Sequence, residues 1–468
     1  MGRTAGLIFL AKIFAPSSTF AILYALGRIH GVEPVGQFNA CITILTVFQF
    51  FGGLGLDSYL TREAARAPEE ARGLLQGIRR YVLWICIASI LTAVCGTTIA
   101  GYSQPMIEAV GIGSLALLPF ALVSLCDATF IGLGRTKTVA WISLFENALR
   151  LSLSVAVIFF HFNLLLLMAA HVIGKGSALI LYGIATARLP KAHTSTHTAL
   201  PHLRTVTTFM GILMVYAIFW KVDVLLLSRI RGDYEAGVYS MANKAVMIFF
   251  MAPSSLVTAA LPRLSSAFAH DRAQVDNIFK KTAGAVSFYF IPISLILMLR
   301  GGDLFNLLRL GSRFAVAGPI VPILAGVLAM MSLIEVCFRT MLSAGLERRG
   351  FWVGFRSMIV CLFGVGAATW IGGYRATAWA MLACVGFDLA QNLWYVRRLV
   401  NGLPKVFLQI LTEGAVLGVI LYGVRQCPLI AFLCIAFSVH LFLSHVIGIL
   451  KIGELRELLN DVVRRQAA

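Results

Sequence analysis

The feature that most constrains this chain is a succession of apolar runs, each about 20 residues or longer, separated by short polar loops. A run of this length is long enough to cross the hydrocarbon core of a bilayer as a helix. Because lipid offers no hydrogen-bond partner to an open backbone, a chain that crosses repeatedly must be helical. Only 13% of the residues are charged and the mean hydropathy is +0.85, whereas soluble domains carry about 25% charge. The sequence therefore predicts an all-α, polytopic membrane protein.

The apolar runs predict about fourteen transmembrane helices. We place them at 5–26, 35–59, 81–103, 110–133, 138–160, 163–187, 206–228, 237–262, 283–299, 314–341, 351–371, 375–396, 406–424 and 428–450. When the N-terminus starts in the cytoplasm, the inside segments hold twenty-four Lys and Arg, and the outside loops with their flanks hold eight. Short cytoplasmic loops are enriched in Lys and Arg, so this bias predicts that both termini are cytoplasmic.

A short internal repeat divides the predicted spans into two halves. The segment Leu26–Gly36 aligns without a gap with Leu227–Gly237, and the same residue recurs at these equivalent places: Arg28 and Arg229, Ile29 and Ile230, Gly31 and Gly232, Gly36 and Gly237. Six spans separate the equivalent positions, and an even number gives both halves the same orientation. The pattern predicts two six-helix lobes related by a parallel pseudo-twofold axis, a cleft between them, and two extra C-terminal helices.

The predicted domains follow from this division. They are a first six-helix lobe at 1–190, a cytoplasmic linker at 191–205, a second six-helix lobe at 206–400, two additional spans at 401–450 and a cytoplasmic tail at 451–468. Apolar and charged residues alternate along the tail with helical spacing. The tail is therefore predicted to be an amphipathic helix on the inner leaflet.

Several function classes find no support in the sequence. The net charge of +18 comes from basic residues scattered over short loops, as the positive-inside rule requires, so it does not indicate a nucleic-acid partner. The nine cysteines form no CxxC pair and lie almost entirely within apolar runs. No phosphate-binding loop, catalytic triad signature or HExxH motif is present. We predict no catalytic residue, no metal site and no cofactor, although coupling to protons or sodium ions is open.

Charged residues inside the spans are the candidate functional residues. A charge at the centre of a membrane helix costs about 2.5–3.5 kcal/mol on insertion scales, so such residues usually face a cavity or a partner. Four lysines lack an acid at the favourable spacing on their own helix, and they are the candidates for a cationic substrate-binding cleft: Lys12, Lys175, Lys221 and Lys244. The acids Asp223, Asp127 and Asp388 are candidates for gating or ion coupling.

Two further pairs of charges have a local explanation. Glu146 precedes Arg150 by four residues, and Glu335 precedes Arg339 by four residues. On a helix this spacing and order favour an ion pair, so both pairs are predicted to be structural. Asp223 lies two residues from Lys221, which points elsewhere on a helix. We therefore expect Asp223 to pair with Lys244 on the next helix, in one transport state more than in the other.

Three segments resemble a known family. They are Gly53–Arg66 (GLGLDSYLTREAAR), Gly132–Lys137 (GLGRTK), and Lys221–Asp223 followed by Gly237–Lys244 (GVYSMANK). The first resembles the end of the second helix of polysaccharide transporters in the multidrug/oligosaccharidyl-lipid/polysaccharide flippase superfamily. The others resemble the next interior hairpin and the start of the second half. The resemblance implies two six-helix lobes, alternating access and export of a lipid-linked oligosaccharide.

The leading hypothesis is therefore a flippase of the bacterial inner membrane for a polyprenyl-diphosphate-linked oligosaccharide, such as an O-antigen or exopolysaccharide repeat unit. Cationic side chains would hold the diphosphate by charge-assisted hydrogen bonds. Its partners would be the lipid-linked glycan, the bilayer and other proteins of polysaccharide assembly. The alternatives are a cation-coupled multidrug exporter of the same superfamily and, from another class, a membrane glycosyltransferase or polysaccharide polymerase.

Overall fold

The computed structural model describes residues 2–53, 56–160, 162–189, 211–212, 214–307 and 312–447. Throughout these ranges the regular structure is helical, with no strand, so the all-α prediction is confirmed. Ten of the described helices are long and apolar enough to cross a membrane, and Ile13–Ile29 is a shorter apolar segment. The exact number of fourteen spans stays a prediction. The predicted linker 191–205 and tail 451–468 lie outside the described residues.

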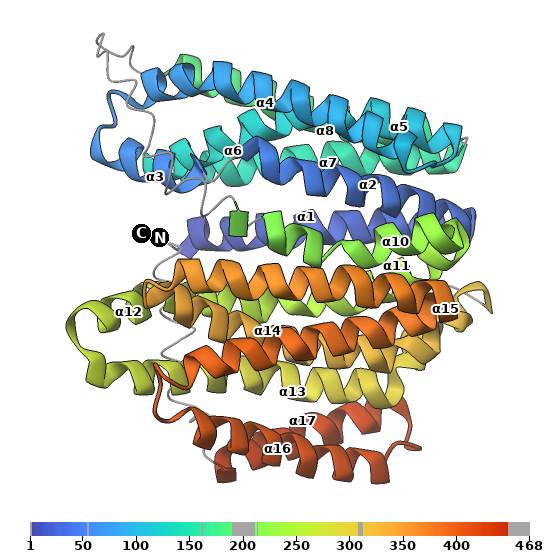
Figure 1. Cartoon of the computed structure of the whole chain (residues 1–468), viewed down its shortest axis with the longest axis vertical. Coiled ribbons are helices and arrows are strands. Elements are labelled where there is room, and N and C mark those ends of the chain that lie inside the picture. Colours follow the sequence, from blue (N-terminus) through green and yellow to red (C-terminus); the bar gives the residue numbers. More distant parts are fainter. Residues whose placement is uncertain are drawn as a thin grey trace. The chain divides into compact units, whose positions relative to one another are not determined.

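The chain forms two compact units that meet in the sequence between Ser240 and Met241. The first unit contains α1 (Gly2–Ile29), α2 (Val32–Gly53), α3 (Leu56–Arg66), α4 (Ala71–Ile99), α5 (Gln104–Ser114), α6 (Leu117–Gly132), α7 (Thr136–Phe160), α8 (Leu164–Ala187), α10 (Val222–Arg231) and the first part of α11 (Asp233–Met247) (Figure 1). Within it, α1 packs on α7, α7 on α8, and α6 on α3, α4 and α8.

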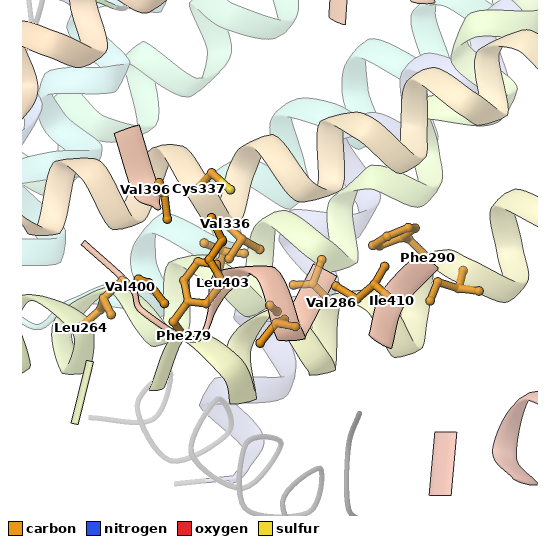
Figure 2. Packing of buried hydrophobic residues seen from close by; sticks show 14 of the residues in the cluster. Leu264, Phe279, Val286, Phe290, Val336, Cys337, Val396, Val400, Leu403 and Ile410 are labelled. Carbon is orange, nitrogen blue, oxygen red and sulfur yellow. The ribbon is translucent and has the colours of Figure 1, made fainter. Parts of the chain in front are cut away.

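The second unit contains the end of α11, the 3-10 turns η1 (Ile248–Phe250), η2 (Arg272–Gln274) and η3 (Ser312–Ile320), and six further helices: α12 (Met251–His270), α13 (Val275–Leu307), α14 (Val321–Ser343), α15 (Glu347–Val396), α16 (Leu403–Gly423) and α17 (Leu429–Ile447). α13 packs on α12, α14, α16 and α17, so it is central to this unit. Figure 2 shows part of the apolar core that α12, α13, α14, α15 and α16 share.

Two turns show why the repeated glycines are needed. Gly31 joins α1 to α2 and Gly232 joins α10 to α11, with φ of 98° and 87°. Residues with a side chain rarely adopt such a backbone conformation, so glycine is required at each turn. A third turn lies inside α15, where Gly373 has φ 59° and ψ −149°. It divides α15 into two limbs that correspond to the predicted spans 351–371 and 375–396.

The second glycine of each repeat makes a close backbone contact inside the first unit. A Cβ atom on Gly36 would lie 1.9 Å from the carbonyl oxygen of Asp233, and one on Gly237 would lie 2.1 Å from that of Val32. Val32 and Asp233 are themselves equivalent positions of the repeat. The contact is therefore reciprocal, which is the pattern that twofold symmetry produces.

A hydrogen bond extends the same contact by one helical turn. The Asn39 amide nitrogen donates to the Ser240 hydroxyl at 2.8 Å, and both side chains are buried. Asn39 and Ser240 again occupy equivalent places, three residues after Gly36 and Gly237. Because the repeated hairpins pack on each other, α10 and the start of α11 belong to the first compact unit, although their sequence begins the second half of the repeat.

Candidate functional site

Charged side chains from neighbouring helices meet inside the first unit. Glu146 on α7 is 4% exposed, and its Oε1 lies 2.5 Å from the Nζ of Lys175 on α8. The Lys175 ammonium also lies 5.0 Å from the centre of the Phe120 ring of α6, close enough for a cation–π contact. Lys175, which has no acid at the favourable spacing on its own helix, thus finds its counter-charge on a neighbouring helix.

Arg150 also differs from expectation. It donates to the hydroxyls of Ser18 and Thr19 on α1, both at 2.8 Å, and forms no ion pair with Glu146 among the described residues. Glu146 is one turn away on α7 but is occupied by Lys175. The Nε of Arg150 is buried without a hydrogen-bond partner in the described part of the chain. Within the described ranges, Arg150 thus bonds only to neutral groups and keeps an unused donor.

Three more polar side chains lie on α6 and α8. The Tyr182 hydroxyl of α8 donates to the carboxylate of Asp127 on α6, and the Tyr182 ring packs edge-on against Phe130 with ring centres 5.5 Å apart. His171 precedes Lys175 by one turn and is 6% exposed. Neither of its ring nitrogens has a partner among the described residues. We call the following set the first-unit polar cluster: Asp127, Glu146, Arg150, His171, Lys175 and Tyr182.

The remaining lysine candidates lie elsewhere. Lys12 is in α1, and its side chain lies outside the described residues. Lys221 precedes the first turn of α10 and is half-buried. Lys244 is in the part of α11 that belongs to the second unit, whereas Asp223 belongs to the first. The predicted pairing of Asp223 with Lys244 therefore stays a prediction.

Asp223 has identified partners within the first unit. It is 1% exposed, one of its oxygens accepts the Tyr239 hydroxyl at 2.7 Å, and the other accepts the backbone N–H of Val224 at 2.8 Å. The bond between Tyr239 of α11 and Asp223 of α10 joins the two helices of the repeated hairpin.

Asp388 lies in a different buried network, between the two limbs of α15. Ser357 of the first limb donates to Asp388 Oδ1 at 2.6 Å and accepts from Gln391 Nε2 at 3.0 Å. Asn392 Nδ2 donates to the carbonyl of Asp388 at 2.9 Å. These bonds leave three oxygens, Asp388 Oδ2, Gln391 Oε1 and Asn392 Oδ1, buried without a donor among the described residues.

The second predicted structural pair lies on α14. Glu335 and Arg339 form an ion pair with an oxygen–nitrogen distance of 2.9 Å, as their spacing and order favour. Their side chains are 16% and 34% exposed, so this pair is more open to its surroundings than Glu146 and Lys175. Both residues come from one helix, and the pair ties no helices together.

Comparison with known proteins identifies the family. A family described as polysaccharide biosynthesis protein matches residues 1–268, more than half of the chain. The chain belongs to this family. The comparison with curated protein sequences gives no significant match.

Several solved structures of transporters share the fold of this chain. One is titled lipid II flippase MurJ, inward closed conformation; it has a TM-score of 0.74 and 13% identity, over 94% of this chain and 98% of that chain. A second is titled as an inward-facing multidrug resistance MATE family transporter of the MOP superfamily. It has a TM-score of 0.65 and 11% identity, over 86% of this chain and 96% of that chain. A third, the MATE multidrug transporter DinF-BH, has a TM-score of 0.63 and 17% identity, over 85% of this chain and 97% of that chain. The fold predicted from the sequence resemblance is confirmed.

Several residues of this polysaccharide biosynthesis protein were not predicted as site residues. Ser18, Thr19 and Tyr182 bond to charged groups across helices, and nothing in their spacing identifies those partners. Gln391 and Asn392 could have been predicted from the sequence, because they follow Asp388 by three and four residues and so share its helix face.

Proposed function

We propose that this chain is a flippase that moves a polyprenyl-diphosphate-linked oligosaccharide from the cytoplasmic to the outer leaflet of the bacterial inner membrane by alternating access, with both termini cytoplasmic. The observation that carries the proposal is Arg150, an intramembrane guanidinium that, among the described residues, bonds only to neutral groups and retains a buried, unused Nε donor. Membership in a polysaccharide biosynthesis family supports a glycan substrate.

The chemistry of a diphosphate suits the first-unit polar cluster. A guanidinium presents several donors in one plane and binds phosphate oxygens by charge-assisted hydrogen bonds. Arg150 can exchange its bonds to Ser18 and Thr19 for such bonds without leaving a carboxylate unpaired. Lys175 is held by Glu146 at 2.5 Å and so is a secondary candidate. Lys12, Lys221 and Lys244 remain candidates for other substrate contacts, and the polyprenyl chain would stay in the lipid.

Two alternatives suit the same site less well. A multidrug exporter that binds cationic compounds needs available carboxylates. In the cluster, Glu146 is occupied by Lys175 and Asp127 by the Tyr182 hydroxyl, and Arg150 would repel a bound cation. A glycosyltransferase or polymerase usually needs a sizeable outer domain, and the longest predicted outer loop spans only 300–313. Proteins of polysaccharide assembly are the expected partners.

Ion coupling, if present, would involve Asp388. Its Oδ2 is a buried acceptor without a donor among the described residues, which a proton or a sodium ion would satisfy, and the amide oxygens of Gln391 and Asn392 are two more such acceptors. Asp127 and Asp223 each accept a tyrosine hydroxyl and are weaker candidates. Asp388→Asn should abolish stimulation of transport by an imposed proton or sodium gradient while leaving gradient-independent flipping. Unchanged stimulation by both ions would exclude Asp388 from coupling.

The test of the main proposal uses purified protein in liposomes that contain a labelled polyprenyl-diphosphate oligosaccharide. Appearance of the glycan in the outer leaflet is followed with an enzyme that cannot cross the membrane. Arg150→Ala should slow flipping about tenfold or more, since a hydrogen bond to a charged group is worth roughly 1.5–3 kcal/mol. Arg150→Lys should retain more activity, because the charge remains.

A matched control and a counter-test complete this design. Arg356 also lies within a predicted span, but its side chain is exposed, so Arg356→Ala should leave flipping unchanged. A panel of cationic drugs tested in the same liposomes addresses the multidrug alternative. Drug export by the wild type without glycan flipping would overturn the proposed function, and full glycan flipping by Arg150→Ala would remove Arg150 from substrate binding.

A further inference from the structure

A second ionisable site lies in the two C-terminal helices, far along the chain from the first-unit polar cluster. Glu413 of α16 is 0% exposed and His440 of α17 is 2% exposed. Their Oε1 and Nδ1 atoms are 3.0 Å apart. Ser444, one turn after His440, donates to the same Oε1. The other nitrogen of His440, Nε2, lies 2.8 Å from the carbonyl oxygen of Phe288 on α13.

These contacts determine where protons must be. A backbone carbonyl only accepts hydrogen bonds, so His440 Nε2 must carry a hydrogen. The remaining nitrogen, Nδ1, lies 3.5 Å from the Ser444 hydroxyl, whose hydrogen goes to the carboxylate, and it faces that carboxylate oxygen itself at 3.0 Å. Two acceptors at this distance cannot bond without a proton between them. That proton lies either on the ring, as imidazolium and carboxylate, or on the acid, as imidazole and carboxylic acid. In both arrangements the net charge of the pair is zero.

We propose that Glu413 and His440 form a proton-binding site, and that α16 and α17 are held together and against α13 in its proton-loaded form. Loss of the proton would leave a net negative charge at a buried position and set two lone pairs against each other. Glu413 Oε2 already has no donor among the described residues, so nothing there compensates the charge. A buried charge without a partner is strongly destabilising.

Three other ionisable groups on the packed helices have partners elsewhere or are exposed. On α13, Arg300 bonds to Asp303 and to the carbonyls of Arg425 and Cys427, at the opposite end of α17. On α16 and α17, Lys405 and His445 are exposed. The contribution of α13 at the site is the Phe288 carbonyl and its ring, whose centre lies 4.7 Å from that of His440. Of the described contacts of Glu413, the proton shared with His440 is the one that brings a compensating positive charge.

The first experiment locates the proton in the full-length protein in lipid nanodiscs. Nitrogen NMR of labelled histidine, with the His440 signal assigned by its loss in His440→Gln, reports the protonation of each ring nitrogen. Infrared difference spectra between wild type and Glu413→Gln report a protonated carboxyl group. An imidazolium, or a neutral ring together with a protonated Glu413, supports the site. An ionised Glu413 beside an unprotonated Nδ1 overturns it.

The second experiment separates the proton site from simple packing. His440→Ala should lower the midpoint of thermal unfolding by at least about 5 °C, because it strands Glu413. Adding Glu413→Gln to His440→Ala should restore part of this loss, since a neutral amide needs no counter-charge. Lost packing alone would not be restored. The matched control is His445→Ala, on the exposed face of the same helix, which should have no effect.

The outcome does not depend on transport. A double variant that is no more stable than His440→Ala overturns the proton site, whatever the substrate of the protein. Conversely, failure of glycan flipping in liposomes leaves the expected spectra and unfolding midpoints unchanged. The two proposals therefore fail separately.

Discussion

Replacement of Glu146 by Gln should destabilise the first unit more than replacement of Lys175 by Ala. The two side chains are 6% and 16% exposed and their charged atoms lie 2.5 Å apart. Removing one partner of such a buried pair costs roughly 3–5 kcal/mol, and Glu146→Gln should lower the free energy of unfolding by this amount. After Lys175→Ala, the Arg150 guanidinium can turn to Glu146 on the same helix face. A new bond to a charged group recovers roughly 1.5–3 kcal/mol, so this variant should lose less.

A double-mutant cycle measures the pair directly. Wild type, both single variants and Glu146→Gln with Lys175→Ala are unfolded reversibly in mixed micelles of SDS and a mild detergent. We expect a coupling energy of about 1–3 kcal/mol. The matched control is the cycle of Glu335→Gln and Arg339→Ala, where one partner is 34% exposed and the coupling should stay below about 1 kcal/mol. Coupling near zero for Glu146 and Lys175 would refute the ion pair and with it the revised assignment of Arg150.

Three further predictions concern the repeated hairpins and the α15 turn. Gly36→Ala and Gly237→Ala should lower the midpoint of thermal unfolding equally, because each new Cβ would lie about 2 Å from a backbone oxygen. The control is Gly111→Ala, which adds a Cβ in open space and should not lower the midpoint. Unequal losses for Gly36→Ala and Gly237→Ala would contradict the twofold contact. Gly373→Ala should cost roughly 1–3 kcal/mol of unfolding free energy because its backbone conformation is almost restricted to glycine, and Gly364→Ala on the same helix is the control, with no loss expected. Asp223→Asn should reduce the rate of glycan export divided by the abundance of the protein, as the gating hypothesis for Asp223 requires. A normalised rate equal to that of the wild type would exclude Asp223 from gating.

The sequence by itself was sufficient for the fold class and for most of the helices. Apolar runs predict membrane helices because lipid leaves the backbone no other way to satisfy its hydrogen bonds. The repeat at Gly31 and Gly232 was readable for a similarly local reason, since a tight turn with positive φ requires glycine. A feature that depends only on one segment and its solvent can be predicted from the sequence of that segment.

Only the tertiary structure decided the partners of the buried charges. Spacing along α7 predicted that Glu146 binds Arg150, yet the rotation of α8 against α7 brings Lys175 to Glu146 and leaves Arg150 to the hydroxyls of α1. In the same way, the position of His440 between Glu413 and a carbonyl of α13 requires three helices to pack in one arrangement. An ion pair between helices depends on their crossing and rotation, which are set by the packing of whole helix faces and not by the spacing of residues along any one of them.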